Sequence, residues 1–217
     1  ICKHGFKRGM IMKIRYSLLI STGIAILFSS CSSVQEPAYR VLDKREGYEV
    51  RRYQPYVVAE TTVEGEHDEA LNRGFRRLFK YIDGANTGSK NIPMTAPVIA
   101  EPGDTSEKIP MTAPVIQEKT GNSHRIAFVM PEGSTMKDLP QPTIPDVTLR
   151  EVPARDVAVL SYSWYAGEEK IMDKVKELIT YLERDGVEYK PGYQSARYDP
   201  PWTPPFMRRN EVFIELK

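Results

Sequence analysis

The segment from Ile92 to Ile116 contains the eight residues IPMTAPVI twice, separated by a short polar spacer. Its prolines restrict what it can form, because proline cannot donate a hydrogen bond to a β-ladder and pushes the preceding residue toward an extended backbone. A solenoid is excluded, since stacked repeats need at least three units and this chain has two copies. We therefore expect a local structure, a hairpin-like pair of strands that carry the same side chains on corresponding faces.

Alternate residues of an extended strand share one face, and the repeat offers the same chemistry on both strands. The matching side chains are Met94, Ala96 and Val98 in the first copy and Met111, Ala113 and Val115 in the second. Two interpretations remain open. The methionines are adaptable filler in a core, which is their more usual role, or they form the apolar wall of a ligand cleft against a flat, polarizable guest.

The composition limits the classes of protein to which the chain can belong. With 217 residues, 41% hydrophobic and 27% charged, it resembles one globular domain, and a net charge of +1 argues against a nucleic-acid partner. Cys2 and Cys31 both precede the globular part, which argues against a disulfide framework or a thiolate metal site within it. No phosphate-binding glycine loop, nucleophile elbow or zinc spacing occurs, so we expect no catalytic residue and no enzyme.

The amino-terminal segment has the layout of a secretory signal peptide. Met12 opens a short basic stretch, which is followed by the uncharged apolar run from Tyr16 to Phe28 and by two serines and Cys31. The run is too short to span a hydrocarbon core, which needs roughly twenty residues. Cys31 resembles the lipidated cysteine of a bacterial lipobox, although Phe28 stands where an aliphatic residue is usual. Ordinary secretion, with cleavage at a small residue, is the alternative.

This layout predicts the organisation of the whole chain. We expect residues 1–11 to be an over-extended start, residues 12–31 a signal peptide ending at the lipidated Cys31, residues 32–38 a tether and residues 39–217 the domain. Lipidation would hold the protein on a membrane surface without spanning it. We therefore expect a monomeric periplasmic lipoprotein on the outer membrane, with the lipid as its only membrane contact.

From Tyr39 onward, strand-like runs alternate with two amphipathic helices. Leu71, Phe75 and Leu78 belong to an apolar stripe that predicts a helix over residues 68–82, and a similar stripe predicts a helix from Glu168 to Arg184. Strands are predicted in the runs YRVLDK, YEVRRY, YVVAETTVEG, HRIAFVMP, VTLREVP, VAVLSYSW, VEYKP with YQSARY, and NEVFIEL. Each half thus contains strands, a helix and strands. We expect an α+β domain, a distorted antiparallel β-barrel of about eight strands with two helices and an internal pseudo-twofold duplication.

Two motifs carry a resemblance to a known family. They are MTAPV, preceded by an amphipathic helix with Lys80-Tyr81, and YDPPWTPPFMRRNEVFIEL from Tyr198 to Leu216. From Tyr39 to Lys217 the chain resembles the SOUL heme-binding protein family, and the doubled MTAPV resembles its bacterial branch. The resemblance implies a distorted antiparallel barrel with two helices and an internal duplication. It also implies non-catalytic binding of heme or a related tetrapyrrole in a shallow apolar cleft beside the first helix.

Carried onto this sequence, the resemblance implies ligand contacts from Phe75, Phe79, Lys80, Met94, Met111, Tyr198, Trp202 and Phe206. Two departures are notable. Arg52 stands where some relatives carry a histidine proposed as an axial iron ligand, and Asn72 and Thr203 stand where other members have basic residues proposed to meet the propionates. These departures motivate one alternative, an envelope interaction protein that has lost heme binding. A second alternative is an enzyme acting on a small hydrophobic ligand in the same cleft.

Ligation of the iron is the remaining question. Heme iron is held by His, Cys, Met or Tyr, and the domain's histidines are His67 and His124. We expect His67 to be solvated or near the helix cap, and neither histidine to be an axial ligand, because nothing in their spacing supplies an orienting partner. We therefore expect heme without an assigned metal ligand. The run from Arg208 to Glu211 is expected to be a polar strand entry whose charges pair locally.

Overall fold

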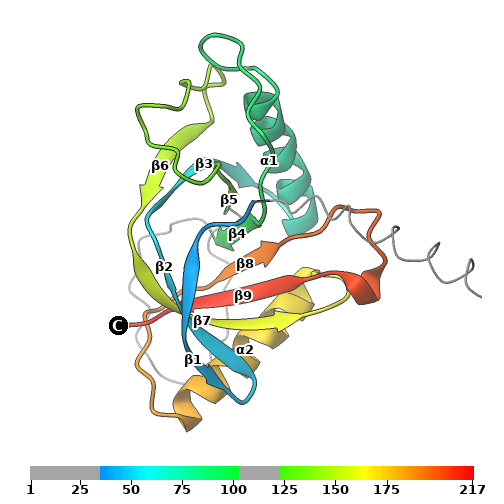
Figure 1. Cartoon of the computed structure of the whole chain (residues 1–217). Coiled ribbons are helices and arrows are strands. Elements are labelled where there is room, and N and C mark those ends of the chain that lie inside the picture. Colours follow the sequence, from blue (N-terminus) through cyan, green and yellow to red (C-terminus); the bar gives the residue numbers. More distant parts are fainter. Residues whose placement is uncertain (1–34, 103–122) are drawn as a thin grey trace, which may run out of the picture. The chain divides into compact units, whose positions relative to one another are not determined.

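The computed structural model describes residues 35–102 and 123–217 (Figure 1). By its internal contacts the chain divides into Ile1–Ser33 and Val34–Lys217, and the described residues belong to the second unit. Its elements, in chain order, are β1 (Tyr39–Arg45), β2 (Tyr48–Tyr53), β3 (Tyr56–Glu64), α1 (His67–Ile82), β4 (Val98–Pro102), β5 (Ser123–Val129), β6 (Thr148–Val152), β7 (Arg155–Tyr162), α2 (Glu168–Arg184), β8 (Gln194–Arg197), the short 3-10 helix η1 (Pro205–Met207) and β9 (Asn210–Glu215). Both predicted helices are confirmed, and α1 begins one residue before the predicted start.

The strands form one antiparallel sheet in the order β1-β2-β7-β9-β8-β4-β5-β3-β6. Apart from β1, this order is symmetric about the central β8–β4 pair, with β9, β7 and β2 on one side and β5, β3 and β6 on the other. The first strand of each half pairs with the other half, since β2 lies against β7 and β6 lies against β3. The α+β class and the pseudo-twofold duplication are therefore confirmed. The sheet has nine strands rather than about eight, and it is a curled sheet with β1 and β6 as its edges in the part of the chain that is described (Figure 1).

Each helix packs against one half of the sheet. The buried stripe of α1 includes Ala70, Leu78 and Tyr81 and lies on β3 and β5. Gly74 faces Ile126 of β5 so closely that an added Cβ would lie 2.8 Å from the Ile126 Cδ1 atom. The helix therefore approaches the sheet at a position where only glycine fits without a shift of its neighbour.

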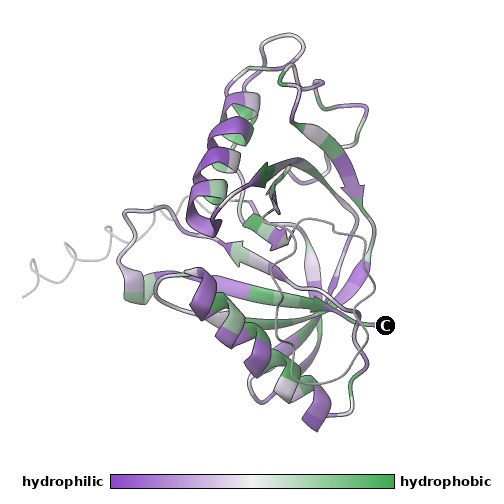
Figure 2. Ribbon diagram, turned by 180° about the vertical axis from the view of Figure 1, so that it is seen from behind, coloured by the Kyte–Doolittle hydropathy of each residue, from purple (hydrophilic) through white to green (hydrophobic). Residues whose placement is uncertain are grey.

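The second helix repeats this arrangement on β7 and β9. The side chains that pack beneath α2 include Leu160 of β7 and Val212 and Ile214 of β9. The next residues along these strands, such as Val159 and Phe213, belong to a separate apolar cluster, because successive side chains of a strand point to opposite faces. Figure 2 shows hydrophilic residues along the outer surfaces of both helices and hydrophobic residues along the strands behind them. The alternation of NEVFIEL predicts that Val212, Ile214 and Leu216 share one face of the strand, and this prediction is confirmed.

The first copy of the repeat differs from its prediction. Residues 92–97 form no strand, and β4 begins only at Val98. Over Val98–Ala100 both edges of β4 are paired, with β5 on one side and β8 on the other. The predicted pairing of the two copies as neighbouring strands is thus wrong for the first copy, because its prolines lack the N–H groups of a ladder and β4 has other partners. The second copy, with Met111, lies outside the described residues.

The predicted shared face of the first copy is also wrong. Met94 is 44% exposed, whereas Thr95 and Ala96 are buried. Thr95 Oγ1 donates a hydrogen bond to the carbonyl of Val129, and the Ala96 N–H donates one to the carbonyl of Gln35 at 3.0 Å. These contacts turn the segment so that consecutive residues, rather than alternate ones, are buried.

Among the described helices, none combines the length and the apolar character that are needed to cross a membrane.

Candidate functional site

Two phenylalanines form an exposed aromatic surface on α1. The rings of Phe75 and Phe79 are stacked, with centroids 6.2 Å apart and planes inclined by 13°. They are 37% and 43% exposed, although they continue the apolar stripe of the helix. The ring of Phe128, on β5, contacts Phe75 edge-on at 5.2 Å and closes the base of this surface. We call Phe75 and Phe79, with Phe128 beneath them, the aromatic face of α1.

Cations lie beside this face. Arg76 and Lys80 directly follow the two phenylalanines in the helix and are exposed, and neither forms an ion pair with a described residue. Arg51 and Arg52 are two further cations that the sequence offers to the propionates of a ligand, and both are engaged with other residues. Arg52 forms two hydrogen bonds of 2.7 Å with Asp156 across β2 and β7, in the half of the sheet covered by α2. Arg51 is buried in the network described next.

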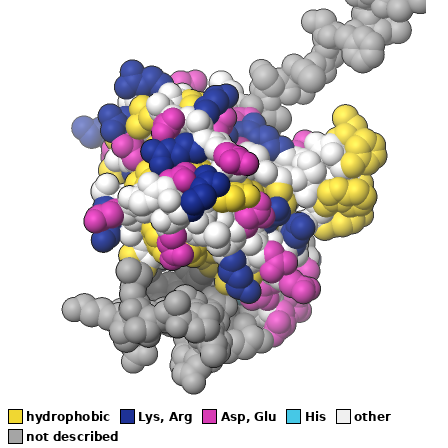
Figure 3. All heavy atoms as spheres, turned by 90° about the horizontal axis from the view of Figure 1, so that it is seen from below, with side chains coloured by type: hydrophobic (Ala, Val, Ile, Leu, Met, Phe, Trp, Pro, Cys, Tyr) yellow, Lys and Arg dark blue, Asp and Glu magenta, His cyan; other side chains and the backbone are white. Residues whose placement is uncertain are grey.

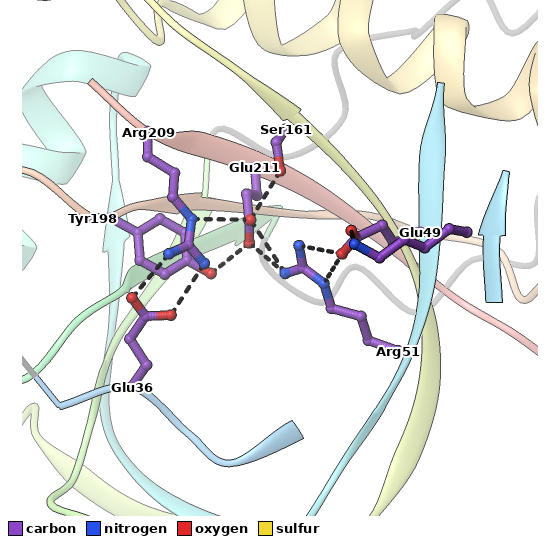
Figure 4. Close-up of polar contacts among 8 residues, drawn as sticks. Glu36, Glu49, Arg51, Ser161, Tyr198, Arg209 and Glu211 are labelled. Atoms are coloured by element: carbon purple, nitrogen blue, oxygen red, sulfur yellow. Dashed lines mark hydrogen bonds and ion pairs between the residues drawn. The ribbon is translucent and has the colours of Figure 1, made fainter. Parts of the chain in front are cut away.

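A buried carboxylate organises the opposite face of the sheet from α2. Glu211 of β9 is fully buried, and its oxygens accept hydrogen bonds from Arg51 Nη1 at 3.1 and 3.2 Å, Ser161 Oγ at 2.9 Å, Tyr198 Oη at 2.5 Å and Arg209 Nε at 3.1 Å (Figure 4). Its partners therefore come from β2, β7, the residue after β8 and the residue before β9. The predicted local pairing of the Arg208–Glu211 run is confirmed for Arg209, but the contact with Arg51 spans 160 residues of sequence.

The network shifts the pKa values of its members. Burial raises the pKa of the Tyr198 hydroxyl, and the negative charge of Glu211 raises it further. Burial lowers the pKa of the Arg51 guanidinium, but attraction to Glu211 and interactions with Tyr53 and Glu49 together outweigh that effect and leave the pKa raised. Tyr198 is consequently a neutral hydrogen-bond donor held by Glu211, with the guanidinium of Arg209 3.8 Å above its ring.

Trp202 and Phe206 lie in a different environment. Both belong to the connection between β8 and β9, where Trp202 is 83% exposed and Phe206 is 64% exposed. No ring contact among the described residues joins them to Phe75 or Phe79. The eight ligand contacts implied by the sequence therefore separate. Phe75, Phe79 and Lys80 share one helix, Met94 is exposed on the loop that follows it, and Tyr198 faces the buried network.

The two histidines of the domain lie together, which the sequence did not indicate. Their rings meet edge-to-face with centroids 5.3 Å apart, although 57 residues separate them in sequence. His67 is the first residue of α1, so its expected place near the cap is confirmed. It is only 9% exposed and is therefore not solvated, because the first turn of α1 packs onto the sheet. Burial lowers the pKa of His67, and the positive charges of Arg197 and His124 lower it further. His67 Nε2 is buried and has no hydrogen-bond partner within the described part of the chain.

Known proteins resemble the chain over most of its length. The SOUL heme-binding protein family matches residues 34–105 and 100–215. Heme-binding protein 2 of Homo sapiens is 30% identical over 174 residues, which are 78% of this chain and 78% of that protein. Heme-binding protein 1 of Xenopus laevis is 28% identical over 168 residues, 77% of this chain and 82% of its own length.

Solved structures extend the likeness of fold. The EcmrR C-terminal domain superimposes with a TM-score of 0.57 at 10% identity and covers 82% of this chain and 98% of its own. A hydrolase encoded by lin2189 from Listeria innocua has a TM-score of 0.51 at 9% identity and covers 78% and 91% of the two chains. At such identities the likeness concerns the fold alone. The matches to the family and to the heme-binding proteins are matches of sequence over most of the chain. They show that this chain belongs to the SOUL heme-binding protein family.

Proposed function

We propose that this protein binds heme or a related tetrapyrrole, without catalysis, on the aromatic face of α1. The observation that carries the proposal is the stacked, partly exposed pair Phe75 and Phe79, which has the flatness and the apolar character of a surface for a macrocycle. Aromatic groups prefer offset-stacked or edge-to-face contacts, and Phe128 already holds Phe75 in place from below. Membership in the SOUL heme-binding protein family supports the choice of ligand.

The residues around this face fit the rest of such a ligand. The propionates of heme are anionic, and Arg76 and Lys80 are cations on the same helix that have no ion-pair partner among the described residues. Charge-assisted hydrogen bonds from these side chains would fix the orientation of the macrocycle. Met94, on the loop after α1, would supply a further apolar contact, and Met111 and Tyr198 remain predicted contacts.

The iron would be bound without an assigned protein ligand. The imidazole of His67 is buried beneath the first turn of α1, whereas Phe75 and Phe79 lie two to three turns further along the exposed flank. We expect His67→Ala and His124→Ala to leave the absorption spectrum of bound hemin unchanged. Arg52 lies on β2, in the half of the sheet that α2 covers, so Arg52→His would not bring a nitrogen to the aromatic face of α1.

We further propose that the protein acts as a lipid-anchored envelope protein, with Cys31 as the attachment site and the periplasm as its compartment. The order of basic start, short apolar run and cysteine supports this proposal. Cys31 lies outside the described residues. Heme held on an exposed helix face at a membrane surface would suit a carrier or buffer of the tetrapyrrole.

Titration with hemin tests the binding site. Removing one aromatic contact, in Phe79→Ala, should weaken hemin binding about two- to tenfold, since an aromatic pair contributes about 0.5–1.5 kcal/mol beyond its buried area. The double variant Phe75→Ala/Phe79→Ala should lose more. Leu42→Ala is the matched control, because Leu42 is a 41% exposed apolar residue on β1.

Stability must be followed in the same variants, since truncating a half-buried phenylalanine costs about 1–2 kcal/mol, part of the cost at a fully buried site. If the double variant is folded and binds hemin as the parent does, the ligand does not bind on the aromatic face of α1. A parent chain that binds no hemin would favour the interaction protein, and conversion of an added ligand on incubation would favour the enzyme.

A further inference from the structure

The connections β7–α2 and β8–β9, which meet at a backbone hydrogen bond between Trp164 and Pro205, expose five large apolar side chains. We call them the aromatic loop surface, and its members, with their exposed fractions, are Trp164 (59%), Tyr165 (63%), Trp202 (83%), Phe206 (64%) and Met207 (64%). Figure 3 shows a projection of hydrophobic side chains at one side of the domain, on the side where η1 lies in Figure 1, next to a surface of mixed charges. Trp164 and Trp202 are the two tryptophans of the entire chain.

The aromatic loop surface is held in a defined shape. The N–H of Trp164 donates to the carbonyl of Pro205 at 2.8 Å, and the Asn210 side-chain amide donates to the carbonyl of Trp164 at 2.9 Å, which joins the two connections. Arg208 Nε donates to the carbonyl of Thr203 at 2.8 Å. Trp164 has a φ of 81°, a backbone conformation that side-chain-bearing residues rarely adopt. A strained residue and a group of exposed apolar side chains thus occur together here, and each of these features is enriched at binding surfaces.

The start of the described chain is tied to this surface. Both oxygens of Glu36 accept hydrogen bonds from Arg209, at 2.9 and 3.0 Å, and Arg209 directly follows the loop that bears Trp202 and Phe206 (Figure 4). Cys31 precedes Gln35 by four residues, and four residues span at most about 14 Å. A lipid attached to Cys31 would thus bring the side of the domain that carries Arg209 close to the bilayer.

We propose that the aromatic loop surface inserts at the headgroup level of a phospholipid bilayer and so sets the orientation of the domain on the membrane. The proposal rests on the lipid anchor put forward above. Trp and Tyr concentrate at membrane interfaces, because their rings are apolar and their N–H or O–H groups remain hydrated. The half-buried Arg208 donates to the carbonyls of Thr203 and Pro201, and its guanidinium lies 5.0 Å from the centroid of the Tyr165 ring. Its positive charge at this surface would favour anionic lipid headgroups. A membrane is the one partner that the short tether itself would hold against this surface.

Tryptophan fluorescence tests this inference directly, because Trp164 and Trp202 report on no other part of the chain. The full chain is reconstituted without hemin into vesicles of phosphatidylethanolamine and phosphatidylglycerol, with or without lipids brominated near the headgroup. We expect the emission to shift to shorter wavelength, the brominated lipids to quench it, and aqueous iodide to lose access to it. Phe206→Ser/Met207→Ser should weaken the quenching, whereas Leu42→Ser on β1 should not.

The outcomes separate this inference from the lipid anchor. A vesicle-bound chain whose emission is neither shifted nor quenched would overturn the inference and leave the anchor intact. Quenching in the parent chain, together with unchanged membrane fractionation of Cys31→Ser in cells, would support the surface and reject lipidation. A concentration-dependent shift without vesicles, accompanied by a doubled mass in sedimentation, would show that the surface binds a second copy of the chain and would overturn the assignment to lipid.

Discussion

The buried ion pair between Arg51 and Glu211 joins two ends of the domain, and its contribution to the free energy of unfolding can be predicted. The side chain of Arg51 is 6% exposed and that of Glu211 is fully buried, so each charge depends on its partner for a large part of its compensation. Removing one partner of a buried ion pair costs about 3–5 kcal/mol, because the remaining charge is left without a counter-ion. We therefore propose Arg51→Met, Glu211→Leu and the double variant as a cycle.

The contacts of each residue set the expected order of these losses. In Arg51→Met the carboxylate keeps Arg209 as a counter-charge, as well as the hydroxyl groups of Ser161 and Tyr198, which predicts a loss near the lower limit, about 3 kcal/mol. In Glu211→Leu the buried guanidinium retains the partly exposed Glu49 as its counter-charge and the ring of Tyr39, whose centroid is 4.6 Å from the Arg51 Cζ atom. Tyr198 also loses its acceptor, and together these changes predict a loss of about 4–5 kcal/mol. The double variant should lose about 2–3 kcal/mol less than the sum of the two, since it leaves no orphaned partner in this pair.

Urea unfolding followed by circular dichroism at neutral pH measures the free energy of unfolding of the four proteins. Additivity within about 0.5 kcal/mol would refute the reasoning, because it would show that the two residues do not interact energetically. A decrease in the free energy of unfolding of less than about 1 kcal/mol in Glu211→Leu would refute the reasoning as well. It would show that the buried carboxylate and its hydrogen bonds contribute little to stability.

Three further predictions concern α1 and the amino-terminal segment. Gly74→Ala should lower the free energy of unfolding by about 1–2 kcal/mol, because crowding against Ile126 outweighs the gain in helix propensity, and a raised melting temperature would contradict this. The pKa of His67 is lowered in the folded state, so below about pH 6.5 the unfolded chain binds more protons than the folded chain. The free energy of unfolding therefore decreases as the pH is lowered, by up to about 1.4 kcal/mol per pH unit. His67→Gln should remove this component, and identical slopes in both proteins would contradict the assignment. Cys31→Ser should release the domain from cell membranes or stall it as a precursor, and unchanged fractionation would reject the lipid anchor.

Several features of this protein could be predicted from residues that are close together in the sequence. The helix from Glu168 to Arg184 was predicted with its observed bounds, because its apolar stripe and the Asp-Gly that ends it act within a few residues. The alternation of NEVFIEL predicted which side chains of β9 face α2. The family was also indicated by sequence, since proline-rich motifs such as YDPPWTPPF do not arise from generic β propensity.

Other features were decided by contacts between distant residues. His67 was expected to be solvated or near the helix cap, and it lies at the start of α1 but is buried against His124. Glu211 was expected to pair locally, and it also binds Arg51, 160 residues away. The first copy of IPMTAPVI was expected to pair with the second, and β4 instead lies between β5 and β8. Local periodicity says which face of a strand or helix is apolar, but not which strand will lie beside it.

The same distinction applies to the candidate sites. The sequence by itself determined that Phe75 and Phe79 lie on the same face of one helix, because they are four residues apart and four residues make about one turn. Only the tertiary structure decided that both rings stay partly exposed, that Tyr198 turns toward Glu211, and that Trp164 joins Trp202 on one surface. The physical reason is that exposure depends on how the sheet curls and on which loops meet, and these are set by the sum of long-range packing and hydrogen bonds rather than by the order of neighbouring residues.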